Sequence, residues 1–392
     1  MSSAPTTLPT NPHGTVATQG PVLVVGTGLL GTSLALALSA SGVAVQLSDT
    51  SPTSLALARD MSAGRVRSDG DEAPQLVVVA TPPDVAASVV LAQLSAFPEA
   101  VVTDVASVKQ RVVAEVRAHA GQEVRRYVGS HPMAGRERSG AGAADCDLFV
   151  GRPWVIVPDG ATPQAELVVR NLAVDVGATP LRMAAAEHDE AVAAVSHVPQ
   201  LVSSLLAARL EELPESALAL AGQGLRDTTR IAASDPRLWS AILVGNAGPV
   251  VGLLRALRED LDTLIGGIAP AAVDPASPDY TAAGRAQTIA PGAVGAITDV
   301  MGRGNTGQAR IPGKHGGAPR RYAEVQVLVP DTAGSLGRLF SDVGAAGVNI
   351  EDFAMEHSAG QSAGIAMLSV SPAAAQPLEE TLEEGGWRVV RL

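Results

Sequence analysis

Cysteine, aromatic residues and positive charge are all scarce in this chain of 392 residues. The single cysteine, Cys146, cannot form a disulfide within the chain, so we expect a reducing compartment, the cytoplasm. Lys and Arg number 28 against 40 Asp and Glu, and the net charge of −12 argues against nucleic acid or an anionic membrane as a partner. No run approaches the ~20 apolar residues of a membrane span, so no transmembrane helix is expected.

Apolar residues are abundant, at 46% of the chain with 17% charged, which is typical of a globular protein rich in Ala, Val and Leu. The length allows two or three domains with cores of their own. Residues 1–19 are rich in Ser, Thr and Pro and have no apolar core of the signal-peptide kind, so we expect them to form a disordered tail.

A glycine-rich turn follows the first short apolar run, residues 21–25, which is suited to a strand buried on both faces. The segment Gly26–Gly31 has the GxGxxG spacing, and a helical pattern over 34–40 comes next. A second predicted strand, 43–47, leads to Asp49, an acid about 20 residues beyond the glycines. This context favours a dinucleotide-binding site of the Rossmann type over a plain glycine-rich turn.

Each glycine has an expected role. Gly26 would allow the tight turn, Gly28 would admit the pyrophosphate, and Gly31 would let the helix pack closely on the sheet. The N-terminus of that helix would then face the phosphates with its partial positive charge. The residues expected to contact the cofactor are Gly26, Thr27, Gly28, Leu29, Leu30, Gly31, Asp49, Thr81 and Pro82.

Asp49 discriminates between the two nicotinamide cofactors. A carboxylate there can accept hydrogen bonds from the adenosine ribose and would repel a 2′-phosphate. Thr50 and Ser51 follow it, and no arginine does. The sequence therefore predicts NAD rather than NADP.

Further buried strands complete a parallel sheet. Residues 76–80 form one strand, which ends at Thr81-Pro82 near the cofactor. Residues 101–109 form a strand that turns into a helix, and 153–157 are expected to be the last strand of the sheet. We therefore assign residues 20–162 to a dinucleotide-binding α/β domain.

A histidine loop, residues 129–135, follows a short apolar stretch. Pro132 biases His131 toward an extended backbone, and a strand end of a nucleotide-binding sheet is where such folds place ligands. Neutral imidazole can accept a proton near pH 7, although a lone histidine is more often structural or merely exposed. Ser107 and Lys109 should lie at the same edge of the sheet, and Asp104 is expected to cap the turn before them.

Residues 163–301 read mainly as helices. The segment Ser196–Gln200 interrupts an apolar helix, and its proline should kink that helix and free a carbonyl. Asp227 and Arg230 are three residues apart and would share a helix face. They form either a surface ion pair of little energetic value or an arginine that an aspartate orients to bind a carboxylate.

The last part of the chain is a separate unit. Residues 302–321 are rich in glycine and basic residues and contain no acid, which predicts a linker. From 322 to 392 the pattern is strand, helix, strand, strand, helix, strand, a ferredoxin-like arrangement.

Taken together, these segments resemble the prephenate dehydrogenases of the tyrosine pathway, over nearly everything from residue 20 onward. The matching segments are 26–31, 103–109, 129–135, 188–189, 196–199 and 227–231. Residues 322–392 resemble an ACT domain, a ferredoxin-like module that binds amino acids, through 330–336 and 347–350. No single segment identifies the family. The resemblance is specific because all of the segments occur together in this order and at this spacing.

The resemblance implies an NAD-dependent oxidative decarboxylation of prephenate to 4-hydroxyphenylpyruvate, with no metal. His131 would hydrogen-bond the ring hydroxyl, and Ser107 would support that contact. Arg230, held by Asp227, would bind the ring carboxylate. The remaining pocket residues would be Ser196, His197 and Gln200. Aromatisation supplies the thermodynamic pull, so the protein mainly orients the substrate and accepts one proton.

Three alternatives stay open. Many relatives have a histidine where this chain has Gln200, and an amide supplies no positive charge, so arogenate is the alternative substrate. A non-catalytic sensor of NAD and amino acids is the second. A β-hydroxyacid dehydrogenase is the third, although such enzymes use a lysine of the second domain and this chain has none between residues 158 and 300.

The ACT resemblance implies feedback by tyrosine or phenylalanine, the alternative being a dimerisation or stability module without a ligand. The expected effector contacts are Asp331, Gly334, Leu336, Asn349 and Ile350. The helical domain, apolar on several faces, predicts a homodimer built through it.

Overall fold

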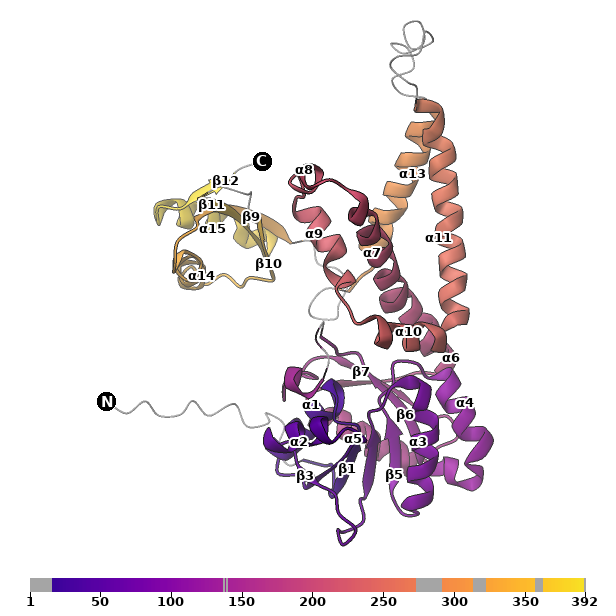
Figure 1. Ribbon diagram of the computed structural model, residues 1–392. Coiled ribbons are helices and arrows are strands. Elements are labelled where there is room, and N and C mark those ends of the chain that lie inside the picture. The colour runs from indigo at the N-terminus through magenta and orange to yellow at the C-terminus, as the bar shows by residue number, and fades with distance from the viewer. Residues whose placement is uncertain are drawn as a thin grey trace, which may run out of the picture. The chain divides into compact units, whose positions relative to one another are not determined.

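The computed structural model describes residues 16–136, 138, 140–272, 291–312, 322–356 and 362–390. The chain divides into two compact units (Figure 1), the first comprising residues 1–211 and 229–255 and the second residues 212–228 and 256–392. Most of the expected N-terminal tail lies outside the described residues. Its last part is ordered, because the amide and hydroxyl of Thr18 each donate to the Asp175 carboxylate at 2.6 Å.

The first unit contains an eight-stranded sheet in the order β3-β2-β1-β4-β5-β6-β7-β8. Its strands are β1 (Val22–Val25), β2 (Val45–Ser48), β3 (Arg65–Val66), β4 (Leu76–Val79), β5 (Val101–Asp104), β6 (Tyr127–Pro132), β7 (Pro153–Val157) and β8 (Thr179–Arg182). All described neighbours pair in parallel except β6 and β7, which are antiparallel and place His131 opposite Val155. The predicted doubly wound α/β domain is confirmed.

Helices cover both faces of this sheet. They are α1 (Leu29–Ala40), α2 (Pro52–Asp60), α3 (Pro83–Ala96), α4 (Gln110–His119) and α5 (Pro163–Asp175). Leu38 of α1 and Leu172 of α5 belong to one buried cluster, whereas Val90 of α3 and Val116 of α4 belong to another on the opposite face. The central strands are buried on both faces for this reason, and their sequences read as continuous apolar runs.

The sheet continues beyond the strand that was expected to complete it. After β7 the chain forms α5 and returns as β8, whose Thr179 pairs with Pro153. Polar and exposed residues dominate β8, because it is an edge strand with one neighbour. Its short and polar sequence gave no buried-strand pattern.

Helices follow β8 in the first unit. They are α6 (Ala185–Val192), a π-helical segment (Ala193–His197), α7 (Val198–Ala208), α10 (Pro236–Gly245) and the first part of α11 (Ala247–Ile268). The predicted interruption at Ser196–Gln200 is a π-helical segment rather than a kink alone, which widens the helix by one residue per turn.

The helical run Ala185–Glu212 contains an 18-residue stretch apolar enough to cross a membrane, with a mean hydropathy of 1.5, and α10 with α11 forms a second candidate that is bent by 95°. Inspection of the sequence did not anticipate these runs. His188 and Asp189 near the start of the first run are buried, and the Asp189 carboxylate accepts hydrogen bonds from the start of α4. These contacts join the start of the run to the N-terminus of α4.

The second unit contains α8 (Glu215–Leu218), most of α9 (Gln223–Thr229), the rest of α11 and α13 (Pro291–Gln308). Arg303 of α13 pairs with Asp260 of α11 at 2.7 Å. Residues 302–308 of the predicted linker are therefore helical despite the glycines, and Arg303 in this part contacts α11. Residues 313–321 lie outside the described residues.

A four-stranded antiparallel sheet forms the end of the second unit, in the order β10-β11-β9-β12. Its elements are β9 (Ala323–Pro330), α14 (Ser335–Ala345), β10 (Asp352–Glu356), β11 (Ala363–Val370), α15 (Pro372–Glu384) and β12 (Arg388–Val390). Leu339 of α14 and Leu378 of α15 are buried in one cluster with alternate residues of β9 and β11. The predicted βαββαβ arrangement is confirmed.

Candidate active site

The glycine turn after β1 has the shape that a dinucleotide requires. Gly26 has φ +101°, and a Cβ there would come within 2.5 Å of the Ala80 carbonyl oxygen. A Cβ at Gly31 would lie 1.9 Å from the Gly26 carbonyl oxygen, so only glycine lets α1 start this close to the strand. At Gly28 a Cβ would meet nothing within 4 Å, so the backbone there borders open space. A pyrophosphate fits that space, beside the N-terminus of α1.

Asp49 lies at the end of β2 and is bound to the glycine turn. Its Oδ2 accepts hydrogen bonds from the amide of Thr27 at 2.5 Å and the hydroxyl of Thr27 at 2.8 Å. Its Oδ1 accepts a hydrogen bond from the Ser51 amide at 2.7 Å. The carboxylate is thereby oriented at the C-terminal edge of the sheet, where a ribose hydroxyl can reach its remaining lone pairs.

The other expected cofactor residues lie around the same turn. Leu29 and Leu30 open α1, and both are partly buried against the core. Pro82 precedes α3. The Thr81 hydroxyl is buried and has no hydrogen-bond partner among the described residues. An orphaned donor beside the open backbone of the glycine turn fits a bound dinucleotide, since buried hydroxyls usually have a partner.

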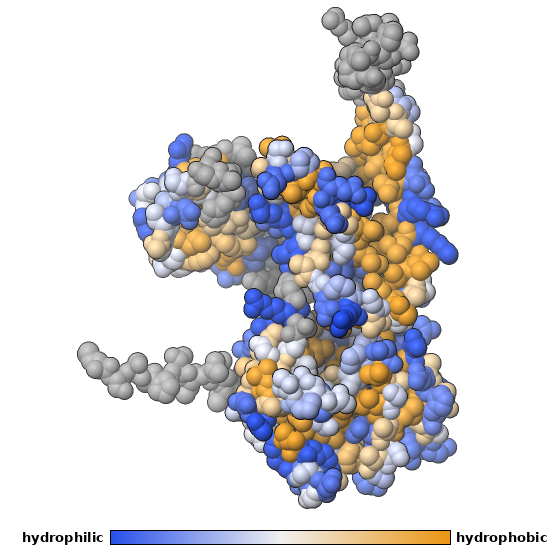
Figure 2. Space-filling view, viewed as in Figure 1, coloured by the Kyte–Doolittle hydropathy of each residue, from blue (hydrophilic) through white to orange (hydrophobic). Residues whose placement is uncertain are grey.

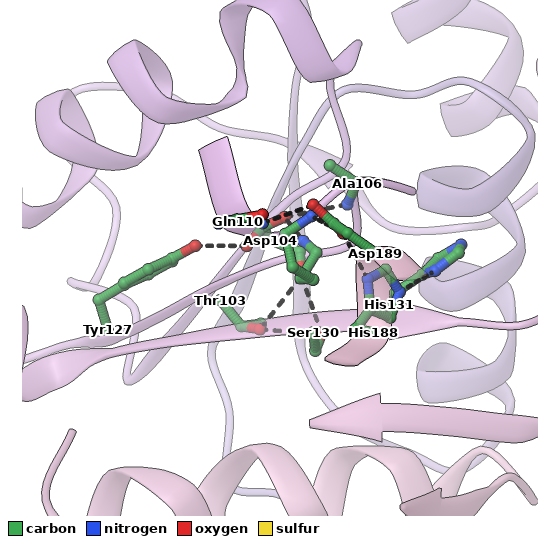
Figure 3. A network of polar contacts seen from close by, with 10 residues as sticks. Thr103, Asp104, Ala106, Gln110, Tyr127, Ser130, His131, His188 and Asp189 are labelled. Atoms are coloured by element: carbon green, nitrogen blue, oxygen red, sulfur yellow. Dashed lines mark hydrogen bonds and ion pairs between the residues drawn. The ribbon is translucent and has the colours of Figure 1, made fainter. Parts of the chain in front are cut away.

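A chain of three polar side chains ends at the predicted base, His131 (Figure 3). Nδ1 of His131 lies 2.8 Å from Nε2 of His188, and Nδ1 of His188 lies 2.7 Å from Oδ1 of Asp189. The Asp189 carboxylate also accepts hydrogen bonds from the backbone amides of Lys109 at 2.8 Å and Gln110 at 2.9 Å, where α4 begins. Strand β6 and helix α6 together position this chain.

The direction of these hydrogen bonds follows from Asp189. A carboxylate only accepts, so His188 carries its proton on Nδ1 and, when neutral, presents a bare Nε2. His131 must then donate from Nδ1, which leaves the lone pair on its Nε2. No described residue hydrogen-bonds that Nε2 atom. The network therefore presents His131 as a base with its free nitrogen available to a ligand.

Burial keeps His131 in its basic form. Loss of hydration lowers the pKa of His131 well below its ordinary value of 6.5, and the neighbouring His188, Lys109 and His197 lower this pKa further. The imidazole is therefore neutral at pH 7 and can accept a proton.

A buried ion pair supports the loop beneath this chain. The ammonium group of Lys109 contacts the Asp104 carboxylate, and both side chains are fully buried. Asp104 also accepts hydrogen bonds from the Tyr127 hydroxyl at 2.7 Å and from the Ala106 amide at 3.0 Å. The predicted turn-capping role of Asp104 is confirmed, and the ion pair adds to it. Loss of hydration lowers the pKa of Lys109, whereas Asp104 raises it.

Ser107 and Ser196 are both half-buried, on the loop before α4 and on the π-helical segment respectively. The Ser107 hydroxyl has no hydrogen-bond partner among the described residues. His197 is buried, and its ring lies edge-on to Trp239 with 6.1 Å between centroids. Nδ1 of His197 lies 3.0 Å from Nδ2 of Asn246.

Gln200 joins α7 to the 3₁₀ turn that carries Arg230 (Arg230–Ala232). Its Nε2 donates to the carbonyl oxygen of Ile231 at 2.8 Å, and its Oε1 accepts a hydrogen bond from the Ser234 hydroxyl at 3.4 Å. The amide thus binds the Arg230 turn through Nε2 and Ser234, just beyond that turn, through Oε1. A direct contact between Gln200 and a substrate stays a prediction.

Arg230 and Asp227 are exposed residues that fall in different compact units. The Asp227 carboxylate accepts a hydrogen bond from Nε2 of Gln223 at 2.8 Å. The pairing expected between Asp227 and Arg230 stays a prediction.

The expected effector residues occupy two connections of the C-terminal unit. Asp331 and Gly334 lie between β9 and α14, where Gly334 has φ +90°, and Leu336 is in the first turn of α14. Asn349 and Ile350 precede β10. Their contact with an amino acid stays a prediction.

Inspection of the sequence missed several residues of this site as functional residues. His188 and Asp189 carry the hydrogen bonds that orient His131, and Asn246 holds His197. His188 and Asn246 each make a contact across 57 positions of the chain, which local patterns do not reveal. The signal for His188 and Asp189 was their place in the matching segment 188–189, to which the sequence assigned no role.

Comparison with known proteins places this geometry in context. The model for the prephenate dehydrogenase nucleotide-binding domain matches residues 34–180, and the model for the prephenate dehydrogenase dimerization domain matches residues 184–275. The probable prephenate dehydrogenase NovF of Streptomyces niveus is 35% identical over 93% of this chain and 98% of its own length. The prephenate dehydrogenase of Bacillus subtilis is 32% identical over 62% of this chain and 68% of its own length.

Two solved structures are similar to this chain over part of its length. The prephenate dehydrogenase of Aquifex aeolicus, crystallised with hydroxyphenyl propionate and NAD⁺, has a TM-score of 0.58 and 30% identity over 64% of this chain and 90% of that one. The arogenate dehydrogenase of Synechocystis has a TM-score of 0.54 and 27% identity over 64% of this chain and 92% of that one.

Proposed function

This chain belongs to the prephenate dehydrogenase family, and we propose that His131 is the general base of an NAD-dependent oxidative decarboxylation of prephenate in tyrosine biosynthesis. The observation that carries the proposal is the chain Asp189, His188, His131, which ends in a neutral imidazole with an available Nε2. A positioned base of this kind contributes about 10²- to 10⁴-fold to the rate of a proton transfer.

Bound NAD would supply the acceptor for the hydride of the hydroxyl-bearing ring carbon. The glycine turn Gly26–Gly31 and Asp49 would hold it, as their open backbone and oriented carboxylate allow. Nε2 of His131 would accept the hydroxyl proton as that hydride leaves. Proton acceptance would pass a positive charge toward His188 and Asp189, and the fixed carboxylate would stabilise that charge.

The remaining side chains would orient the ring. Arg230 would bind the ring carboxylate, since its planar guanidinium matches a carboxylate in two hydrogen bonds. Asp227 would orient Arg230. The Ser107 hydroxyl would hydrogen-bond the ring hydroxyl beside His131, and Ser196 and His197 would line the pocket. Loss of the carboxylate as carbon dioxide then makes the ring aromatic, which drives the reaction forward.

Turnover with prephenate and with arogenate, each with NAD and with NADP, tests the proposal. We expect NADH formation with prephenate and NAD to give the highest kcat/KM of the four combinations. If neither substrate is turned over, the proposed enzymatic function is refuted and an NAD-binding sensor is favoured. A higher kcat/KM with arogenate would make that amino acid the substrate.

Arogenate remains a specific alternative for two reasons. The Synechocystis arogenate dehydrogenase has a similar fold. In addition, Gln200 contributes no positive charge for the carboxylate of a pyruvyl side chain. The same four-way comparison of kcat/KM decides between the two substrates.

A homodimer is the assembly we propose, built through the helical domain. Exposed apolar side chains gather along α11 and α13 of the second unit (Figure 2), among them Leu257, Leu261, Ile265, Val294, Ile297 and Met301. Patches of this kind on a soluble protein mark interaction surfaces, and the matched dimerization domain includes α11. Analytical ultracentrifugation at micromolar concentration checks the stoichiometry.

We propose the cytoplasm as the compartment of the protein. Residues 322–392 would act as an ACT module that binds tyrosine or phenylalanine. Its βαββαβ arrangement and the left-handed Gly334 between β9 and α14 support this proposal. Calorimetry of the full chain with each amino acid tests it. No heat with either one would favour a dimerisation or stability module without a ligand.

A further inference from the structure

We propose that Asn246 is a positioning residue that fixes His197 in the tautomer with its proton on Nε2, so that His197 donates a hydrogen bond to an oxygen of the bound substrate. The donation rests on the proposed function, because it requires His197 to line the substrate pocket. The tautomer itself does not depend on that function.

Asn246 occupies the junction between two helices of the first unit. It is the C-terminal cap of α10, it precedes α11, and only 2% of its surface is exposed. Its Nδ2 lies 2.7 Å from the main-chain oxygen of Asp189 and 3.0 Å from Nδ1 of His197. One buried amide therefore contacts both α6 and the π-helical segment that follows it.

The orientation of this amide is set by its first contact. The main-chain oxygen of Asp189 can only accept, so the amide nitrogen of Asn246 must face it. A flipped amide would place two acceptor oxygens against each other in a buried site, which is unfavourable. The two hydrogens of Nδ2 then serve two acceptors, the Asp189 oxygen and Nδ1 of His197.

Nδ1 of His197 is accordingly an acceptor, and the ring proton resides on Nε2. Burial lowers the pKa of His197 to about 4, so the ring is neutral at pH 7. The edge-on contact with Trp239, at 87° between ring planes, limits rotation of the imidazole. No described residue accepts a hydrogen bond from Nε2 of His197.

The chemistry of the neighbourhood suggests what this donor binds. His131 presents a lone pair on Nε2, whereas His197 presents an N–H. Prephenate offers a hydroxyl to the first and carboxylate or carbonyl oxygens to the second. A positive charge next to His131 would disfavour proton acceptance by that base. A neutral donor such as His197 can bind a substrate oxygen without adding such a charge.

One residue anchors both histidines. The side chain of Asp189 sets the tautomers of His188 and His131, and its main-chain oxygen sets the amide that orients His197. Asp189 of α6 thus determines that His131 presents an acceptor and that His197 presents a donor.

The tautomer can be measured directly in the full-length protein without ligands. We would record ¹⁵N chemical shifts of the histidine side chains and identify His197 by the resonance that His197→Gln removes. The expected result is a proton on Nε2. Asn246→Asp replaces the donor with an acceptor and should move the proton to Nδ1, while Asn246→Ala should leave a mixture of tautomers if the carboxylate is not tolerated. A proton on Nδ1 in the unaltered protein, or no change in either variant, overturns the proposal.

Kinetics then test the donation to substrate. Asn246→Asp should raise the KM for prephenate about tenfold, the effect of one lost hydrogen bond of ~1.4 kcal/mol, with little change in the KM for NAD. Asn305→Asp, a matched change on the exposed surface of α13, should alter neither value. A switched tautomer with an unchanged KM overturns the donation alone. Absence of turnover in the unaltered enzyme would instead remove the proposed function and leave the tautomer result intact.

Discussion

Nδ1 of His188 lies 2.7 Å from Oδ1 of Asp189, and this hydrogen bond decides which nitrogen of His131 is basic. The carboxylate fixes the proton of His188, and His188 in turn fixes the proton of His131. A buried acid two side chains away therefore controls the reactive atom of the site.

Replacing Asp189 should disable the base without removing it. In Asp189→Asn the amide can donate to His188 and reverse its tautomer, and Nε2 of His131 then loses its lone pair. We expect kcat to fall by about 10²- to 10⁴-fold, as when a catalytic histidine is held in the wrong tautomer. Steady-state kinetics measures the loss. Asp175→Asn, which breaks the contacts with Thr18, should lower stability but leave kcat unchanged.

Removal of the base itself gives the reference for that effect. His131→Asn should retain the fold and the affinity for NAD, because its site lies at the end of β6 and apart from the glycine turn. We expect turnover to fall by about 10²- to 10⁴-fold. Circular dichroism and NAD titration serve as controls. Near-normal turnover in this variant would end the assignment of His131 as the general base.

Gln200 should act through the Arg230 turn. Gln200→Leu removes the hydrogen bonds to Ile231 and Ser234 at nearly constant volume, and the turn that carries Arg230 should shift. We expect the KM for prephenate to rise about tenfold, with a smaller change in kcat, and Arg230→Ala should raise KM further. Initial-rate kinetics measures both. Gln376→Leu on the exposed surface of α15 is the matched control, and an unchanged KM in Gln200→Leu would refute the role.

The pH dependence should follow from burial. The pKa of His131 in the free enzyme lies well below 6.5. We therefore expect kcat/KM to be still high at pH 6.5 and to decline only as the pH approaches the lowered pKa of His131. Stability should behave differently. His131 and His197 bind protons more readily in the unfolded chain, so the free energy of unfolding should decrease as pH falls below about 6.5, and for His197 until about pH 4. Urea unfolding between pH 7.5 and 4.5 measures this, and a pH-independent midpoint would contradict it.

The buried pair of Lys109 and Asp104 should be important for stability. Lys109→Met leaves Asp104 as a buried carboxylate with only the Tyr127 hydroxyl and a backbone amide as partners. We expect a loss of ~3–5 kcal/mol in the free energy of unfolding, as for other buried pairs that lose one member. Denaturant unfolding measures it. Arg117→Met, which breaks the exposed pair with Asp159, should change stability by less than ~1 kcal/mol.

The parts of the fold that local chemistry specifies could be predicted from the sequence. Gly26 and Gly31 stand where a side chain would collide with the backbone. The spacing of these glycines is therefore enough to predict the tight turn between β1 and α1. The buried strands read as apolar runs because both of their faces are covered. Residues 179–183 read only as a short extended piece and not as a further strand of the sheet, because an exposed edge strand such as β8 has no such run. Residues 302–308 were assigned to a linker although Arg303 binds α11.

The site could be predicted only where a residue has an unusual local setting. His131 stands before a proline at a strand end, and that setting drew attention to it. His188 and Asn246 act through contacts with distant residues, and neither a His-Asp pair nor a single asparagine in a helical sequence shows which distant residue it contacts. Gln200 was expected to face the substrate because of its position in the motif. Its amide donates to the carbonyl oxygen of Ile231, and its contact with a substrate stays a prediction.

The π-helical segment Ala193–His197 inserts one residue more than an α-helix would use. One residue corresponds to a rotation of about 100°, so α7 is turned by that angle relative to an uninterrupted continuation of α6. The surplus residue sets the angle between two faces of this helical run. One is the face of α6 that carries His188, and the other is the face of α7 that contacts the Arg230 turn through Gln200. A regular α-helix through the same residues would swing Gln200 and Ser203 away from their present side, and the site would come apart without the loss of any named contact residue.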